Sequence, residues 1–368
     1  MCGINGIVRL DREPVSAAAL EAMNTSVCHR GPDDHGVFLH RHVGVGHLRL
    51  SVIDLSSNGH QPMCYTHGGR TAVLTYNGEI YNFGELRAEL EAKGYRFKSR
   101  TDSEVMLAAY LEYGFDCVTR FNGMFAFAIY DVERDILFGA RDRFGEKPFK
   151  YYVDEHRMIF SSELKAILEV DVPRELDLEA VDDYLTLQYV PHPRTGFRNI
   201  HKLPHGHYFV MDVAAKSMRI TRYFDLDYSR KLDLPEEQWL DRIDDALHRS
   251  VERRLIADVP LGVFLSGGVD SSMIVAAMHR FTKDIRSFSV SFAERAYDES
   301  PYARTVAKQY GTTHTEFCVT EADLRAHIDL LVYQFEEPYA DNSQLATFLL
   351  ARLTREHVTV ALSGDAGD

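Results

Sequence analysis

The rhythm of hydrophobic residues changes near residue 236, and this change limits the possible folds more than any other feature of the sequence. Before it, short alternating or apolar runs separated by turn residues predict strands, with two helices between them. After it, strands alternate with helices, as in a parallel sheet with right-handed crossovers. We therefore expect two domains, over residues 1–210 and 236–368, joined by a polar linker over 211–235.

The first domain is predicted to be an α+β layered structure, because its helices are segregated between groups of strands. Two helices are expected, over 84–94 and 103–114, and each ends at a glycine. Strands or hairpins are expected over four segments: 47–55, 71–81, 124–142 and 147–164.

The second domain is predicted to be an α/β domain with a parallel sheet. A helix is expected to begin at Pro235, because five apolar residues from Trp239 to Leu255 recur at four-residue spacing. Ligands of such sheets bind beyond the carboxyl ends of the strands. The expected strands cover 262–267, 287–292, 314–319 and 358–362, with helices from Ser271, from Pro301 and through 355 between them.

Composition counts against several classes of function. The formal net charge is −14 and there is no long basic run, which counts against a nucleic-acid partner. No apolar run approaches the roughly 18 residues of a membrane span, and the first residues lack a signal-peptide core, so a cytoplasmic location is expected. Five scattered cysteines without a C-x-x-C pair favour neither a disulfide framework nor a zinc ribbon. Small-molecule chemistry is the remaining expectation.

The stretch FLSGGVDSS, residues 264–272, predicts a phosphate-binding loop between a strand and a helix. Glycines let backbone N–H groups approach an anion, and the N-terminus of a helix favours negative charge. By itself a serine-glycine turn is equally consistent with a tight connection. The pattern Ser-Gly-Gly-x-Asp-Ser resembles the pyrophosphate loop of ATP pyrophosphatases, which cleave ATP between its α and β phosphates.

A second loop, ALSGDAGD over 361–368, is expected at the same edge of the sheet. Carboxylates that converge on a phosphate require a hard cation between them, and Mg²⁺ commonly bridges the two. Asp270 and Asp368 are the candidate metal ligands, and solvated loop aspartates are the alternative.

The N-terminal sequence MCGING places a cysteine directly after the initiator methionine. Removal of Met1 would leave a thiol and an α-amine on one residue. Such an amine has a pKa of about 7.7–8.0, so roughly a tenth to a sixth is neutral at pH 7 and can act as a base. Cys2 could therefore supply a nucleophile and a base together, or could be a small terminal residue without a role.

Together with Cys2 and the two loops, the motifs RGPDDHG, HLRLSVID, YNGEIYN and SRTDSEV resemble glutamine-hydrolysing asparagine synthetases. The resemblance implies an N-terminal-nucleophile glutaminase of class II, followed by a synthetase domain resembling adenine nucleotide α-hydrolases. It assigns glutamine-site roles to Cys2 (nucleophile), Asn77 and Gly78 (oxyanion hole), Arg49 (α-carboxylate), and Glu79 and Asp102 (α-ammonium).

In the synthetase half the resemblance implies ATP as co-substrate with Mg²⁺. Asp365 falls at the family's catalytic carboxylate, where many members carry a glutamate, and Ala366 replaces a usual glycine. The motif RGPDDHG could contact the substrate or only hold a loop over it. ATP-site roles are implied for Leu265, Ser266, Gly267, Gly268, Asp270, Ser271, Ser363 and Gly364.

The activity expected from this resemblance is asparagine synthesis. Glutamine hydrolysis would release ammonia, which attacks a β-aspartyl-AMP formed from aspartate and ATP with loss of pyrophosphate. Another carboxylate, such as a uronic acid or a peptide side chain, is the alternative acceptor, and a silent glutamine- and nucleotide-binding regulator is the alternative of another class. The family pattern continues beyond Asp368, so a C-terminally incomplete synthetase domain is expected, and a homodimer is left open.

Overall fold

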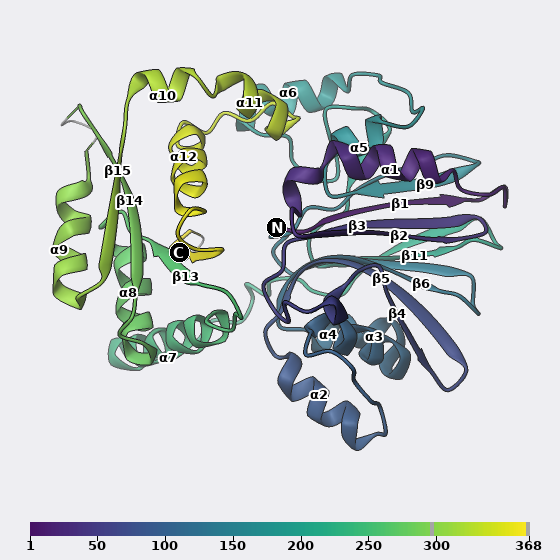
Figure 1. Cartoon of the computed structure of the whole chain (residues 1–368), viewed down its shortest axis with the longest axis horizontal. Helices are drawn as coiled ribbons and strands as arrows, with labels where there is room; N and C mark the ends of the chain where they lie inside the picture. The colour runs from purple at the N-terminus through teal and green to yellow at the C-terminus, as the bar shows by residue number, and fades with distance from the viewer. Residues whose placement is uncertain (295–297, 366–368) are drawn as a thin grey trace. The chain divides into compact units, whose positions relative to one another are not determined.

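The computed structural model describes residues 1–294 and 298–365, and the chain divides into two compact units (Figure 1). Unit 1 consists of Met1–Asp227 together with the short segment Glu336–Ala340. Unit 2 consists of Tyr228–Phe335 and Asp341–Asp368. Each unit has its own sheets, and hydrophobic clusters lie within each unit.

Unit 1 is built on two antiparallel six-stranded sheets. In spatial order, sheet A contains β10 (Ile200–Lys202), β8 (Lys150–Val153), β9 (Arg157–Ser161), β1 (Gly3–Arg9), β3 (Val43–Arg49) and β2 (Asp34–His40). Sheet B contains β12 (Ser217–Arg222), β11 (His207–Asp212), β7 (Ile136–Arg141), β6 (Gly123–Asp131), β5 (Arg70–Ile80) and β4 (Met63–His67).

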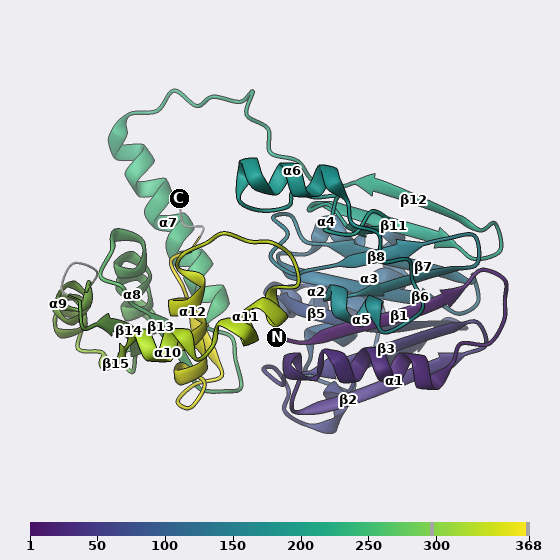
Figure 2. The ribbon, with the colours of Figure 1, turned by 90° about the horizontal axis from the view of Figure 1, so that it is seen from above.

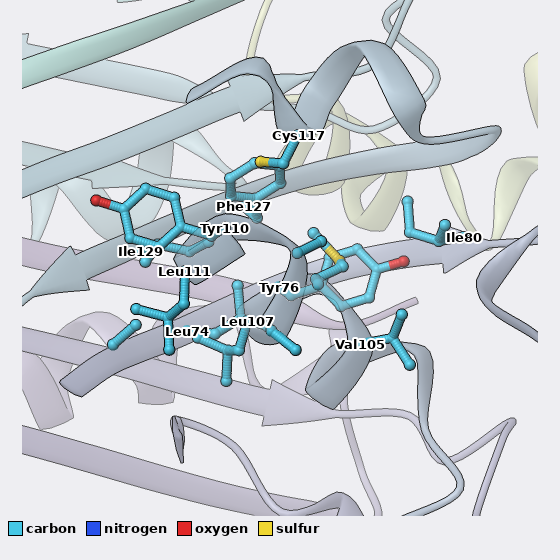
Figure 3. Close-up of a cluster of buried hydrophobic side chains, with 14 of the residues drawn as sticks. Leu74, Tyr76, Ile80, Val105, Leu107, Tyr110, Leu111, Cys117, Phe127 and Ile129 are labelled. Carbon is cyan, nitrogen blue, oxygen red and sulfur yellow. The ribbon is translucent and has the colours of Figure 1, made fainter. Parts of the chain in front are cut away.

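Helices cover the outer faces of both sheets, which gives four layers in the order helix, sheet, sheet, helix (Figure 1). The core between the sheets takes side chains from both, such as Val45 of β3 and Ala128 of β6. A second core joins sheet B to its helices (Figure 3), and a third joins sheet A to its own. The helices are α1 (Ala17–Ser26) and α5 (Leu164–Leu168) over sheet A, and α2 (Phe83–Ala92), α3 (Asp102–Tyr113) and α4 (Cys117–Arg120) over sheet B, with α6 (Leu178–Leu187) following α5.

The layered α+β class predicted for the first domain is confirmed, together with the strand at 71–81, both hairpins and both helices. Thr101 caps α3 by accepting a hydrogen bond from Glu104 N, and Gly114 ends the helix with φ +61°. The strand expected over 47–55 instead ends at Arg49, because the chain then turns back around that side chain. The segment 211–235, expected to be a linker, instead begins inside sheet B, because it contains the end of β11 and all of β12, which form a hairpin.

Unit 2 contains a four-stranded parallel sheet in the order β15 (Thr313–Val319), β14 (Arg286–Phe292), β13 (Leu261–Phe264) and β16 (Val360–Leu362). Helices α9 and α12 pack on opposite faces of this sheet (Figures 1 and 2). The helices are α7 (Glu236–Arg254), α8 (Val269–Phe281), α9 (Ser300–Tyr310), α10 (Glu321–Arg325), α11 (Ile328–Phe335) and α12 (Gln344–Thr354).

The parallel α/β class predicted for the second domain is confirmed. The expected apolar stripe of α7 is only half right: Leu247, Val251 and Leu255 pack against the unit 2 core, whereas Trp239 and Ile243 are exposed. Over the described ranges, every helix is too short or too polar to cross a bilayer.

Candidate active sites in the two units

The first candidate site lies where β1 begins and β3 ends, at one end of sheet A. Gly3 of β1 pairs with Leu48 of β3, so Cys2 lies beside the residues that follow β3. The Cys2 Sγ accepts a hydrogen bond from Leu50 N at 3.4 Å and is half-buried. Two side-chain contacts link this level of sheet A to β5 of sheet B: His47 Nε2 donates to Tyr76 O at 3.0 Å, and Thr75 Oγ1 donates to Gly46 O at 2.9 Å.

Burial raises the pKa of the Cys2 thiol, although the Leu50 N–H and the positive charges of the N-terminus, Arg30 and Arg49 partly oppose the increase. The thiol is therefore protonated at neutral pH. A nucleophilic Cys2 needs a nearby group to take its proton.

Arg30 comes from the RGPDDHG motif and holds the backbone of the cysteine directly. Its Nε donates to Cys2 O at 2.9 Å, and its Nη1 donates to Glu163 Oε1 at 2.6 Å. Burial would raise the pKa of Glu163, but hydrogen bonds and charge from His29, Arg30 and Lys165 outweigh it and hold that pKa far below its usual range. The carboxylate of Glu163 thus stays ionised and fixes Arg30.

Asn77 and Gly78 lie next to each other on β5. Gly78 has φ +154°, and a Cβ there would lie 2.1 Å from Met124 O, so only glycine fits. Asn77 is 1% exposed, and its Nδ2 has no hydrogen-bond partner among the described residues. Arg30 Nη2 is likewise buried without an acceptor in the described part of the chain. Both unsatisfied groups are donors, which a ligand with oxygen atoms would complete.

Arg49 and Asp102, the expected binders of the glutamine α-carboxylate and α-ammonium, also shape the site. Arg49 donates from Nη1 to Ser56 O at 3.0 Å and from Nη2 to Asp54 O at 2.5 Å, which folds the loop after β3. Asp102 Oδ2 accepts from Tyr76 Oη at 2.8 Å and Ile80 N at 2.9 Å, which ties α3 to the end of β5. Burial raises the pKa of Asp102, and these hydrogen bonds partly counter the increase.

Lys147 is a site residue that the sequence analysis missed. It is 7% exposed, its Nζ lies 3.3 Å from Met1 Sδ, and burial lowers its pKa while the charges of Glu146 and Glu79 oppose that change. The ammonium group therefore lies beside the N-terminus and interacts through its charge with the predicted substrate residue Glu79. Its loop, between β7 and β8, carries no motif that would have identified it from the sequence.

The second candidate site lies in unit 2 at the carboxyl ends of β13 and β16. A pocket of about 290 Å³ opens there between the two loops predicted from the sequence. The loops touch, since a Cβ on Gly364 would lie 2.7 Å from Ser271 N. The predicted residues that line the pocket are Leu265, Ser266, Gly268, Asp270, Ser271, Ser363, Gly364 and Asp365.

The first loop is held open by its own serines and glycines. Ser266 Oγ lies 3.0 Å from Ser271 Oγ and accepts from Gly268 N at 3.2 Å. Gly267 does not line the pocket: with φ +87° it turns the chain against α9, where a Cβ would lie 2.5 Å from Ala303 N. The backbone of the loop precedes the first turn of α8, so its N–H groups suit an anion.

The pocket also has walls that the motifs did not indicate. Val290 and Phe292 come from the end of β14, and Thr347 and Leu350 come from α12. The residues of β14 follow from the rule that ligands bind beyond the carboxyl ends of parallel strands. Those of α12 carry no local signal.

Asp270 and Asp365 bring two carboxylates to this pocket, whereas Asp368 and Ala366 lie outside the described residues. Within residues 1–294 and 298–365, no group of three or more His, Cys, Asp or Glu side chains could hold a metal by itself. Mg²⁺ commonly binds one or two carboxylates and completes its shell with water and phosphate oxygens. The two carboxylates therefore fit Mg²⁺ that arrives with a nucleotide.

Comparison with known proteins finds a match for each half of the chain. The family of glutamine amidotransferase domains matches residues 1–224, and the asparagine synthase family matches residues 242–368. A Methanocaldococcus jannaschii protein, provisionally named a glutamine-hydrolysing asparagine synthetase, is 38% identical, with 100% of this chain and 74% of that protein covered.

Two Bacillus subtilis proteins, the glutamine-hydrolysing asparagine synthetases 1 and 3, are 36% and 33% identical over 100% of this chain. The chain spans 58% and 62% of their lengths.

Proposed function

The chain belongs to the family of glutamine-hydrolysing asparagine synthetases, and from that premise we propose that Cys2 hydrolyses glutamine to supply ammonia for asparagine synthesis. Asparagine synthesis is proposed for the whole protein, because the chain spans only part of the length of its relatives. A cytoplasmic location is part of the same proposal.

In the proposed first reaction, Cys2 is the N-terminal residue once Met1 has been removed. Its α-amine takes the thiol proton, the thiolate attacks the glutamine amide carbon, and the C–N bond breaks as the proton passes to the leaving ammonia. Water then attacks the thioester, which releases glutamate and restores the thiol. Because burial raises the pKa of the thiol, Cys2 needs a base, and its own α-amine is the proposed one.

The unsatisfied Nδ2 of Asn77 is the observation that carries this proposal. An unpaired buried donor costs about 1–3 kcal/mol, a cost that a substrate oxygen would remove. The developing oxyanion of the tetrahedral intermediate is such an acceptor, and Gly78 N–H is its proposed second donor. Arg49, Glu79 and Asp102 would bind the charged α-groups of glutamine.

In the proposed second reaction, the pocket of unit 2 binds ATP with its phosphates against the loop Ser266–Ser271. The acceptor carboxylate attacks the α-phosphorus, pyrophosphate leaves, and ammonia then displaces AMP from the acyl adenylate. Asp270 and Asp368 would hold Mg²⁺, which when bound neutralises charge on the phosphates, and Asp365 would be the catalytic carboxylate. Aspartate is the proposed acceptor. If AMP were released with another carboxylate and not with aspartate, that carboxylate would be the acceptor instead.

Substitution of the nucleophile tests the first reaction. Cys2→Ala should abolish glutamate release from glutamine while the protein stays folded, because the change removes only a small side chain at the chain end. Mass spectrometry should find Met1 removed from the wild-type protein. Cys64→Ala, at an exposed cysteine on β4, is the matched control and should hydrolyse glutamine at the wild-type rate. Continued glutamate release by Cys2→Ala would refute the proposed nucleophile.

Nucleotide chemistry is tested separately. ATP with Mg²⁺ should protect residues of the pocket in unit 2 from hydrogen exchange, and Asp270→Asn should weaken this protection without lowering glutaminase activity. ADP and phosphate as the products of ATP turnover, instead of AMP and pyrophosphate, would contradict the proposed cleavage.

A further inference from the structure

Five residues from the synthetase half of the sequence form part of unit 1. The segment Glu336–Ala340 belongs to unit 1, although the residues before and after it, Phe335 and Asp341, belong to unit 2. Glu336 has φ +62°, a conformation that residues other than glycine adopt rarely and keep only when contacts enforce it. The contacts that enforce it come from two carboxylates, Glu336 and Glu337.

Glu336 supplies the N-terminal cap that α5 lacks. The residue preceding this helix, Glu163, makes no side-chain capping hydrogen bond. Instead the two carboxylate oxygens of Glu336 accept hydrogen bonds from Leu164 N and Lys165 N, both at 2.7 Å. Lys150 Nζ lies 3.1 Å from the same carboxylate, whose side chain is 5% exposed. A buried carboxylate at a helix N-terminus with a cationic partner is a strong anchor.

A series of ion pairs and hydrogen bonds connects Glu336 to Cys2 in the proposed glutaminase site. Lys165 Nζ lies 3.8 Å from Glu336 and 3.0 Å from Glu163. Glu163 accepts from Arg30, and Arg30 donates to Cys2 O. All four side chains of this series are at most 10% exposed, so solvent screens their interactions little.

Negative and positive side chains alternate from Glu336 to Arg30. The position of each side chain therefore depends on the charge of its neighbours. The carboxylate of Glu336 shares the ammonium of Lys165 with Glu163. Without the negative charge of Glu336, Lys165 and Lys150 would both attract Glu163, and the hold of Glu163 on Arg30 would weaken. Arg30 would then fix the backbone of Cys2 less well.

We propose that Glu336 is a positioning residue for glutamine hydrolysis, acting on the nucleophile through Lys165, Glu163 and Arg30. This inference rests on the proposed function of Cys2. It deepens that function, because a residue encoded in the synthetase half sets the geometry of the glutaminase nucleophile.

Glu337 provides a matched control in the same segment. Its carboxylate accepts from Gly196 N at 3.2 Å and pairs with Lys202 Nζ at 3.1 Å, and its side chain is 11% exposed. Over the described ranges, neither partner forms a hydrogen bond or ion pair with Glu163 or Arg30. Glu336 and Glu337 thus share burial, charge and a helix- or loop-anchoring role, and differ in their connection to Cys2.

The experiment compares Glu336→Gln with Glu337→Gln in the full chain. Glu336→Gln should lower kcat for glutamine hydrolysis on the order of tenfold, because small misplacements of reacting groups cost that much or more. KM should change little, since Arg49 and Asp102 are held by other contacts. Glu337→Gln should keep both constants close to wild type. The rate at which iodoacetamide alkylates Cys2 should fall with Glu336→Gln only.

Lys165→Met breaks the same path from its other side and should also lower kcat, and the double variant with Glu336→Gln should be no worse than the more severe single one. Circular dichroism and thermal unfolding identify any variant that fails to fold. The inference would be overturned if Glu336→Gln and Glu337→Gln lowered kcat equally, or if Glu336→Gln did not lower kcat at all. A wild-type protein without glutaminase activity would refute the proposed function instead, and the alkylation rates would still decide the role of Glu336.

Discussion

An unsatisfied amide donor on β5 marks the candidate site of unit 1. Asn77 is buried on β5, yet its Nδ2 lacks a partner in the described part of the chain, whereas buried side-chain donors are usually paired. Its neighbour Gly78 adopts a backbone that no other residue could take beside Met124 O. An unpaired hydrogen-bond donor in a rigid backbone position is typical of a preorganised site that stabilises a negatively charged transition state.

Asn77→Ala should therefore lower kcat more than it changes KM. An oxyanion-hole donor contributes about 2.7–4 kcal/mol to transition-state stabilisation, which corresponds to a loss of 10²–10³ in kcat. Steady-state glutaminase kinetics would measure this effect, with Asn342→Ala at an exposed position of unit 2 as the control. A change in KM alone would show that Asn77 binds glutamine in its ground state.

The loop between β13 and α8 shows how one element places a binding site. Gly267 has φ +87°, and a Cβ there would collide with Tyr302 and Ala303 at the start of α9. The turn at Gly267 directs Ser266 and Gly268 to the pocket. The glycine thus works through packing against a helix and makes no pocket contact itself.

Gly267→Ala should destabilise unit 2 and weaken ATP binding. The left-handed backbone costs about 1–2 kcal/mol for alanine, and the collision with α9 adds to this cost. Gly311→Ala is the matched control: Gly311 has φ +65°, but a Cβ there would meet no described atom within 4 Å, so the substitution carries only the backbone cost. Denaturant unfolding and nucleotide titration would compare them. Equal effects in the two variants would show that the contact with α9 is unimportant.

At the scale of the whole molecule, the burial of neutral His47 is expected to make folding stability depend on pH in the mildly acidic range. Burial is the main cause that lowers the pKa of His47 to about 4, although its hydrogen bond to Tyr76 O opposes the shift. At pH values between 6.5 and about 4, the unfolded chain binds a proton at His47 that the folded chain does not. Folding stability therefore falls as the pH drops through this window.

His47→Gln should reduce this acid sensitivity, because glutamine can donate to Tyr76 O without titrating. The shift corresponds to on the order of 3 kcal/mol of lost stability once the pH reaches the folded pKa. Free energies of unfolding at pH 7.5 and pH 5 would test it, with His156→Gln at an exposed site as the control. An unchanged difference between the two pH values in His47→Gln would contradict the assignment.

Local pattern alone predicted much of this molecule. Sequence periodicity and turn residues located β5, the β6–β7 hairpin, α2, α3 and the change from antiparallel to parallel sheets. The loop at Ser266 and the loop at Ser363 were both predicted, and the structure brings them into one pocket. These features depend on residues that are close together in the chain. The spacing and backbone preferences of such residues can be read directly from the sequence.

Only the tertiary structure decided which distant residues meet. β3 (Val43–Arg49) ends at Arg49, whose side chain binds carbonyls further along the chain, and only the second half of α7 packs against the core of unit 2. Lys147, Glu163 and Glu336 gain their roles from partners more than a hundred residues away. Such contacts form when packed layers bring separate segments together, and no local period or propensity encodes the pairing. The sequence by itself thus determined the two fold classes, while packing determined which charges surround Cys2.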